Sequence, residues 1–118
     1  MADSNLFAVE SQLRRIMVHF LKLEHSPAAA PRRKWAVSII DAQAQIDDRL
    51  TPSMRRDVEP RVERLYAAAL RIARGELIDH DEPAAAASLP ETCPYTLDQL
   101  LDETWRPTSR HGHVDEPF

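Results

Sequence analysis

Apolar residues recur at alternating steps of three and four positions in three long stretches of this 118-residue chain. Such spacing follows one face of an α-helix, which turns once in about 3.6 residues. A half-buried strand needs alternation at every second position, and no stretch sustains that pattern for long enough. The chain is therefore predicted to be all-α. The longest stripe is the first, formed by Leu6, Val9, Leu13, Ile16, Phe20 and Leu23.

Proline and glycine mark where the predicted helices begin and end. A residue before proline avoids helical geometry, so the first helix should end at Ser26-Pro27. Proline suits the first position of a helix, and glycine commonly follows the last. The second helix is therefore predicted from near Pro31 to Leu50, and the third from Thr51-Pro52 to Gly75.

Pro60 interrupts the apolar pattern of the third helix. Proline inside a helix removes one backbone hydrogen bond and clashes with the preceding turn, at a cost of about 3 kcal/mol. We therefore expect a kink or a break near residues 57–60. The stripe on either side is formed by Met54, Val58, Val62, Leu65, Ala69 and Ile72.

The segment from Pro90 to Trp105 is predicted to dock on the bundle. Thr96 and Gln99 have the spacing of a capping box, in which each side chain bonds the other residue's backbone N–H, so a short helix should cover about residues 97–103. Fully burying one leucine is worth about 1.5–3 kcal/mol, and this segment offers several apolar groups at once. They are Tyr95, Leu97, Leu100, Leu101 and Trp105.

Periodicity is lost on either side of this segment. Residues 76–90 are acidic and then alanine-rich, which predicts a linker with room for one helical turn. Residues 108–118 have no periodic pattern and are predicted to be a flexible tail. The expected architecture is one domain over residues 1–107, an antiparallel bundle of three main helices with the short C-terminal helix docked across it.

Glycine and cysteine are too scarce for several common kinds of site. With only Gly75 and Gly112, the chain cannot form a glycine-rich phosphate loop or a dinucleotide-binding fingerprint. Its single cysteine, Cys93, excludes an intrachain disulfide and a zinc site built from cysteines. The histidines near acidic residues lie in polar stretches, where a metal would have an incomplete ligand set. We therefore predict no metal site and no cofactor.

Neither a secretory signal nor a membrane span is predicted. The N-terminal residues MADSNLFAVES lack the basic start and the long apolar run of a signal peptide. No stretch approaches the roughly 18 apolar residues of a transmembrane helix. A single cysteine fits a reducing compartment. We therefore expect a cytoplasmic protein that does not enter a membrane.

Charge is divided unevenly along the chain. Residues 1–75 hold 13 Lys and Arg against 9 Asp and Glu, whereas residues 76–118 hold 2 against 10. A basic half followed by an acidic half occurs in nucleic-acid-binding proteins, but the two halves can also neutralise each other in one fold. The basic half carries only +4, which is weak for a nucleic-acid binder and favours the second interpretation.

The strongest candidate site is a basic corner at the start of the second helix, formed by Arg32, Arg33 and Lys34. A helix N-terminus carries partial positive charge, so three cations there are unfavourable unless an anion binds. Backbone N–H groups and Arg side chains could together hold a phosphate or a carboxylate. The alternative is a solvated basic turn that pairs with the acidic half. If the first helix packs alongside, the patch would be extended by Arg14, Arg15 and Lys22.

Two further residues are weak candidates for catalysis. His19 lies at the edge of the first apolar stripe, beside cations, but spacing places no second acid or stabilising group near it. Cys93 has no base near it in the sequence that would activate a thiolate. We expect both residues to have packing roles, so an enzymatic activity is not favoured.

The segment LPETCPYTLDQLLDE, from Leu89 to Glu103, closely resembles the closing motif of the bacterial family called domain of unknown function 29. This closing motif is specific, whereas the helical stretches alone would not be. The resemblance covers roughly residues 6–107. Further similarities lie at the run HFLK from His19 to Lys22, at Pro27 and the basic run into Trp35, at Thr51-Pro52-Ser53, and at Tyr66.

The resemblance implies an all-helical domain found mainly in cyanobacteria and proteobacteria, with no assigned activity, substrate or cofactor. Members usually carry a further helical segment ahead of the region that matches Leu6. We therefore expect either a naturally short version or a segment supplied from elsewhere, with uncovered apolar area near Phe7, Val18 and Leu21. A second copy, as in a homodimer, or another helical protein would cover it. The predicted function is a non-enzymatic protein-interaction module. The alternative is an anion- or nucleic-acid-binding protein that uses the basic corner.

Overall fold

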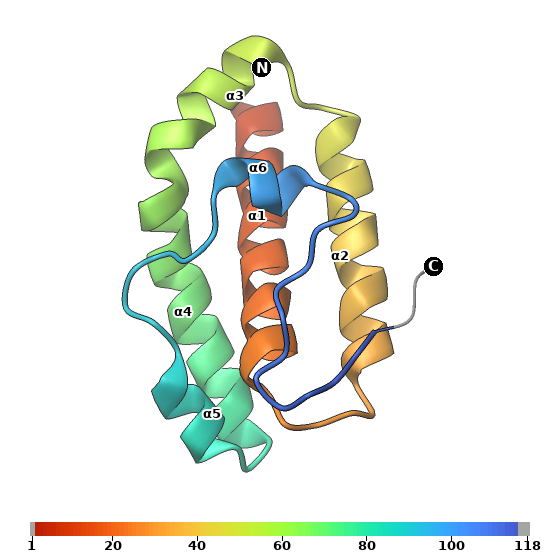
Figure 1. The fold of residues 1–118 in the computed structure, drawn as a ribbon. Helices are drawn as coiled ribbons and strands as arrows, with labels where there is room; N and C mark the ends of the chain where they lie inside the picture. The colour runs from red at the N-terminus through yellow and green to blue at the C-terminus, as the bar shows by residue number, and fades with distance from the viewer. Residues whose placement is uncertain (1, 116–118) are drawn as a thin grey trace.

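Three long helices lie side by side in the computed structural model, which describes residues 2–115 (Figure 1). They are α1 (Ala2–His25), α2 (Arg32–Asp47) and α4 (Val62–Asp79). α1 lies between the other two, and α2 runs antiparallel to both (Figure 1). The predicted stripe of α1 is buried by this arrangement, and Leu13, Ile16 and Phe20 are fully enclosed. The all-helical bundle predicted from the sequence is confirmed.

The third predicted helix is divided at Pro60, as expected. Its first part is α3 (Pro52–Val58), which begins where Thr51 Oγ1 accepts a hydrogen bond of 3.1 Å from the N–H of Met54. A single 3₁₀ turn, η1 (Glu59–Arg61), then contains the proline and leads into α4. The proline therefore changes the helix to a tighter turn. At this turn the chain leaves α3, which crosses the end of the bundle, and enters α4, which runs along it (Figure 1).

The prediction that Gly75 ends the helix is wrong. α4 continues through Gly75 to Asp79, because its next turn has its own tertiary contacts. Leu77 is buried, and Glu76 pairs with Lys22 of α1. The helix is instead followed by Asp81, which has a left-handed backbone with φ of 57°. The predicted linker therefore contains the last turn of α4 and the short helix α5 (Pro83–Ser88).

Residues 90–105, here called the clasp, cross one side of the three-helix layer (Figure 1). Their helix α6 (Leu97–Leu101) begins with the predicted capping box between Thr96 and Gln99, and it ends two residues earlier than predicted. Tyr95 and Trp105 pack on Phe20 of α1, with ring centres 5.2 and 5.5 Å from it. Docking of this segment on the bundle is confirmed. The buried clasp residues are Tyr95, Leu97 and Leu100.

Buried polar side chains of the bundle hold the clasp by its backbone. Tyr66 of α4 donates its hydroxyl to the carbonyl of Pro90 at 2.5 Å. Gln43 of α2 donates its amide to the carbonyls of Leu100 and Asp102 at 3.0 and 3.1 Å. The two bonds from Gln43 satisfy carbonyl groups at the end of α6 that have no partner within so short a helix.

The predicted flexible tail begins at residue 108. Residues 108–115 form no helix or strand, yet they lie against the connection between α1 and α2. The N–H of Arg110 donates to the carbonyl of Glu24 at 2.8 Å, and ring nitrogens of His111 and His113 lie 2.9 and 2.8 Å from the carbonyls of His25 and Pro27. Residues 116–118 of the predicted tail lie outside the described residues. The mobility of the segment stays a prediction, but its contacts make it part of the bundle's surface.

Candidate functional site

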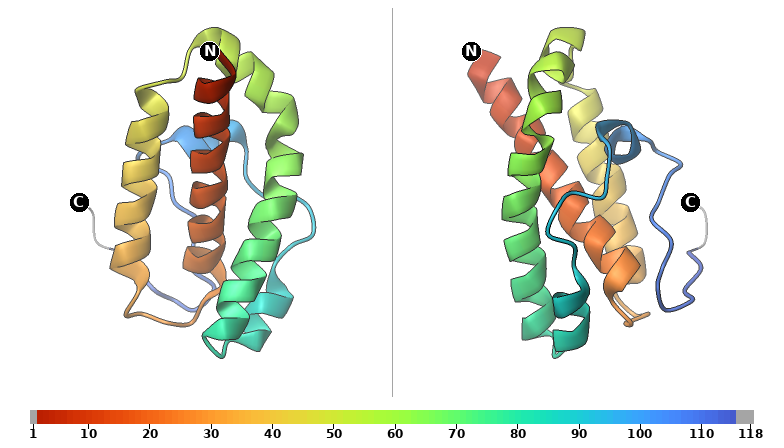
Figure 2. Two further views of the ribbon diagram at one scale, coloured as in Figure 1. Left: turned by 180° about the vertical axis from the view of Figure 1, so that it is seen from behind. Right: turned by 60° about the vertical axis from the view of Figure 1, so that its left-hand side comes forward.

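The clasp covers only one side of the helical layer, and the opposite side leaves α1 in view between α2 and α4 (Figure 2). We call this side the open face. Among residues 2–115, no helix combines the length and apolar character that crossing a bilayer requires. The described side chains also include no cluster of three His, Cys, Asp or Glu residues that could hold a metal ion.

Polar bridges join α1 to both neighbours along the open face. Toward α2, Arg15 Nη2 lies 2.8 Å from Asp41 Oδ2, and Gln12 donates to Gln45 at 3.1 Å. Toward α4, the only described ion pair of Lys22 places its Nζ 2.5 Å from Glu76 Oε1. Side chains that bridge helices in this way have their charges compensated within the chain.

A cleft of about 700 Å³ lies at the lower end of the open face, between α1, α2 and α4. Its cations and anions are balanced, and the ring of Trp35 forms an apolar wall over which Lys22 Nζ lies at 5.5 Å. Balanced charge gives the cleft no preference for an anionic or a cationic ligand. Its main lining residues are His19, Lys22, Lys34, Trp35, Glu76 and Glu82.

His19 reaches this cleft from α1. Burial, aided by the charge of Lys22, lowers the pKa of His19 to about 4, although Glu76 acts in the opposite direction. Its Nδ1 is enclosed and has no hydrogen-bond partner among the described residues. The imidazole of His19 is therefore largely uncharged near neutral pH.

A second hollow, here called the upper groove, lies between the N-terminal halves of α1 and α4 and has a volume of about 490 Å³. Phe7 stands at its edge with 70% of its surface exposed. The small side chains of Ala67 and Ala68 line the α4 side, together with Arg64 and Arg71. The small alanine side chains of α4 leave space beside Phe7 of α1, and this space could hold the side chains of a further helix.

The upper groove is positively charged. Its one carboxylate, Glu10, is buried and lies 3.3 Å from Arg61 and 3.8 Å from Arg64. Arg14 and Arg71 also line the groove, and neither has an ion pair within the described part of the chain. The groove therefore combines an apolar edge with two arginines that form no ion pair with another described residue.

The three residues of the predicted basic corner do not converge on one point. Arg32 is buried and bonded to Asp115, whereas Lys34 lines the lower cleft with Lys22. Arg33 lies near Asp115 and His113, on another side of α2 from the lower cleft. An anion site at this corner stays a prediction, and Arg32 already has an internal carboxylate. That carboxylate belongs to the acidic half, as the alternative interpretation expected.

The predicted extension of the patch does lie on the open face, but its members have separate environments. Arg14 lines the upper groove, Arg15 pairs with Asp41, and Lys22 pairs with Glu76. Arg64 and Arg71 of α4, which the sequence did not single out, lie beside Arg14. The sequence could have indicated both residues, because they lie on the solvent side of the predicted third helix, opposite its apolar stripe.

Two apolar expectations need correction. Val18 and Leu21 were expected near an uncovered groove, but both are buried because α4 packs on that side of α1. Ile72 was expected in the core and is 47% exposed. The buried side of α4 is centred on Tyr66, Ala69 and Ala73, which leaves Ile72 at its edge.

Comparison with known protein families gives a match over most of the chain. The sequence profile of the family described as Domain of unknown function DUF29 matches residues 1–106. Neither the curated proteins nor the solved structures contain a match to the chain.

Proposed function

The chain belongs to the family described as Domain of unknown function DUF29, and we propose that its function is to bind a helix of another polypeptide in the upper groove. The observation that carries this proposal is the exposure of Phe7 at the edge of a groove with an alanine-lined wall. An aromatic side chain can bury 150–250 Å². Such a group is a suitable anchor for helix-in-groove recognition, in which an amphipathic helix inserts its own apolar side chains.

The charges around Phe7 describe the partner. Arg14 and Arg71 flank the groove without a described acidic partner, while Glu10 is already bound by Arg61 and Arg64. A complementary helix would carry apolar residues on one face and a carboxylate at its border, within reach of the arginines of the groove. The apolar contacts would supply most of the affinity, and the carboxylate would set orientation and speed of association.

Site-specific photo-crosslinking in the native cell tests the proposal. A photoreactive residue at Ala68, beside the upper groove, should capture a discrete protein species. The same residue at Ala44, an exposed alanine of α2, should not. Phe7→Ser should remove the Ala68 product while leaving the circular dichroism spectrum unchanged, because Phe7 is largely outside the core. Equal products from both positions, or none from Ala68, would overturn the proposal.

A further inference from the structure

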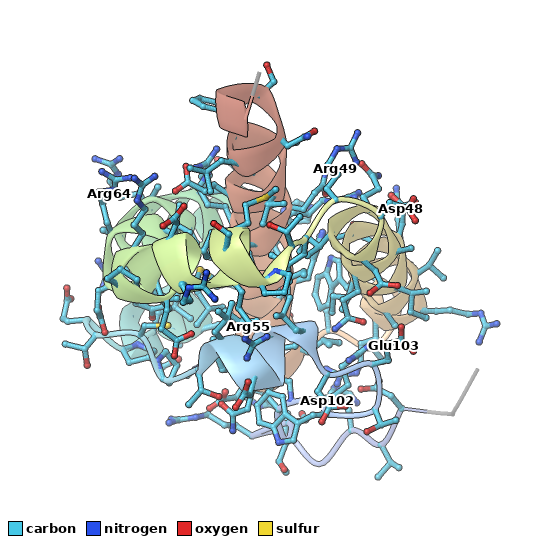
Figure 3. All side chains as sticks on the ribbon, turned by 90° about the horizontal axis from the view of Figure 1, so that it is seen from above. Asp48, Arg49, Arg55, Arg64, Asp102 and Glu103 are labelled. Atoms are coloured by element: carbon cyan, nitrogen blue, oxygen red, sulfur yellow. The ribbon has the colours of Figure 1, made fainter. Side chains whose placement is uncertain are left out.

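Six residues of α4 form one stripe along its solvent side. They include an arginine near the start of the helix, an aspartate at its end, and an isoleucine near the middle. Their spacing of 4, 3, 1, 3 and 4 positions keeps them on one face and reads the same in both directions. Figure 3 shows Arg64 projecting from α4 on the side away from α6. The stripe consists of Arg64, Ala68, Arg71, Ile72, Gly75 and Asp79.

A stripe with this symmetry is complementary to itself when two copies of the helix pack antiparallel about a two-fold axis. Arg64 of one copy then lies opposite Asp79 of the other, at both ends of the contact. Ala68 lies opposite Gly75. Arg71 and Ile72 both lie beside the axis, where the aliphatic stem of each arginine faces the isoleucine of the other copy. The same surface meets itself in such an arrangement, which is the rule for two-fold dimers.

The centre of the stripe has features that the single chain does not explain. Ile72 is 47% exposed, and Gly75 lies inside a helix although glycine weakens helices. A Cβ atom added to Gly75 would meet no atom within 4 Å, so packing within the chain does not require glycine there. Close approach of a second helix opposite Ala68 accounts for the absent side chain.

The charged ends of the stripe are available for pairing. The side chain of Arg64 is 71% exposed. Its nearest described carboxylate, Glu10, lies 3.8 Å from Arg64 but only 3.3 Å from Arg61. Asp79 is exposed and has no ion pair among the described residues. The cross-pairs would therefore form without breaking a strong contact inside either chain.

We infer that the partner of the upper groove and the adjoining α4 stripe is a second copy of this chain, packed through antiparallel α4 helices. Asp79 is then the carboxylate that the second copy brings to Arg64 of the groove. This inference rests on the proposed function, because Arg64, Ala68 and Arg71 belong to both surfaces. A contact of four helical turns is smaller than a standard interface of about 1,600 Å², so dissociation should be measurable in the micromolar range.

Charge reversal in the full chain, followed by sedimentation equilibrium from low to high micromolar concentration, tests the inference. Arg64→Asp and Asp79→Arg should each weaken the dimer roughly tenfold or more, because each places like charges opposite one another at both ends. The double variant should return to within about threefold of the original dissociation constant, as expected for coupled residues. Arg56→Asp, the same charge change at an exposed position of α3, is the matched control.

Gly75→Leu provides a second measurement that does not depend on charge. The single chain has space for the side chain, so thermal stability at low concentration should be kept, while the dimer should be lost. A monomer at all concentrations, or no rescue in the double charge variant, would overturn the inference. If the Ala68 crosslink then contains a different protein, the proposed function stands without the second copy. If the photoreactive residue at Ala68 captures no protein, both the proposed function and the inference of a second copy fail.

Discussion

Arg32 and Asp115 join the first turn of α2 to the end of the described chain, across 83 positions of sequence. Nε and Nη2 of Arg32 each lie 2.8 Å from one carboxylate oxygen of Asp115, the two-bond geometry that strengthens arginine–carboxylate pairs. Nη1 donates to the carbonyl of Leu23 in α1 at 2.9 Å. One buried side chain therefore ties together α1, α2 and the C-terminal segment.

Arg32→Gln should destabilise the protein by about 1–3 kcal/mol, because it leaves the carbonyl of Leu23 unpaired in a buried position. Lys34→Gln, at an exposed position on the same helix, should change the free energy of unfolding by less than about 0.5 kcal/mol. Urea denaturation followed by circular dichroism measures both. Equal effects would mean that Arg32 does not maintain its bonds to Leu23 and Asp115 in solution.

The same contact predicts acid sensitivity. Hydrogen bonds from Arg32 lower the pKa of Asp115 below its ordinary value. Its contribution to stability is therefore present above the ordinary carboxyl pKa and is lost as pH falls through the lowered value. Asp115→Asn should remove this part of the acid dependence. An unchanged profile of unfolding free energy against pH below 4 would contradict the expectation.

His19 should make the protein less stable in mildly acidic solution. Burial lowers the pKa of His19 to about 4, so the unfolded chain binds a proton at this residue between about pH 6.5 and 4 while the folded chain does not. Stability should therefore fall as pH falls through this window. His19→Gln should reduce the slope of stability against pH. Part of the slope should remain, because burial also lowers the pKa of His25. An NMR titration of His19 with a midpoint near 6.5 would refute this.

Removing the clasp should unfold or aggregate the protein. Truncation before Pro90 deletes Tyr95, Leu97 and Leu100, all buried against the helical layer, and exposes Phe20. Each buried leucine contributes about 1.5–3 kcal/mol, so the loss is comparable with the net stability of a small domain. The readout is the thermal melt of the truncated chain. A melt identical to that of the full chain would contradict it.

The reactivity of the Cys93 thiol measures docking of the clasp in the full-length chain. Burial raises the pKa of the Cys93 thiol, so less reactive thiolate is present near neutral pH. A thiol reagent should therefore modify Cys93 much more slowly in the folded protein than in urea. Rates that are equal in the two conditions would show that the clasp is open.

Much of the secondary structure could be predicted because its signals are local. Thr51 and Thr96 each accept a hydrogen bond from an N–H three residues ahead, and such short-range bonds depend on neighbouring residues alone. Gly75 failed as a stop signal because the contacts that extend α4 come from α1, through Lys22. A local preference of about 1 kcal/mol is easily outweighed by such packing.

The sequence by itself determined that the chain forms amphipathic helices, where they are capped, and that its C-terminal segment has an apolar face to dock. Periodicity and capping specify these features, since both act within a few residues. Only the tertiary structure decided that Arg32 pairs with Asp115 and that Ile72 remains exposed beside the upper groove. The ion-pair partner of a charged residue and the burial of a residue at a helix edge depend on how the helices pack against one another. That packing is set jointly by side chains that are distant in the sequence.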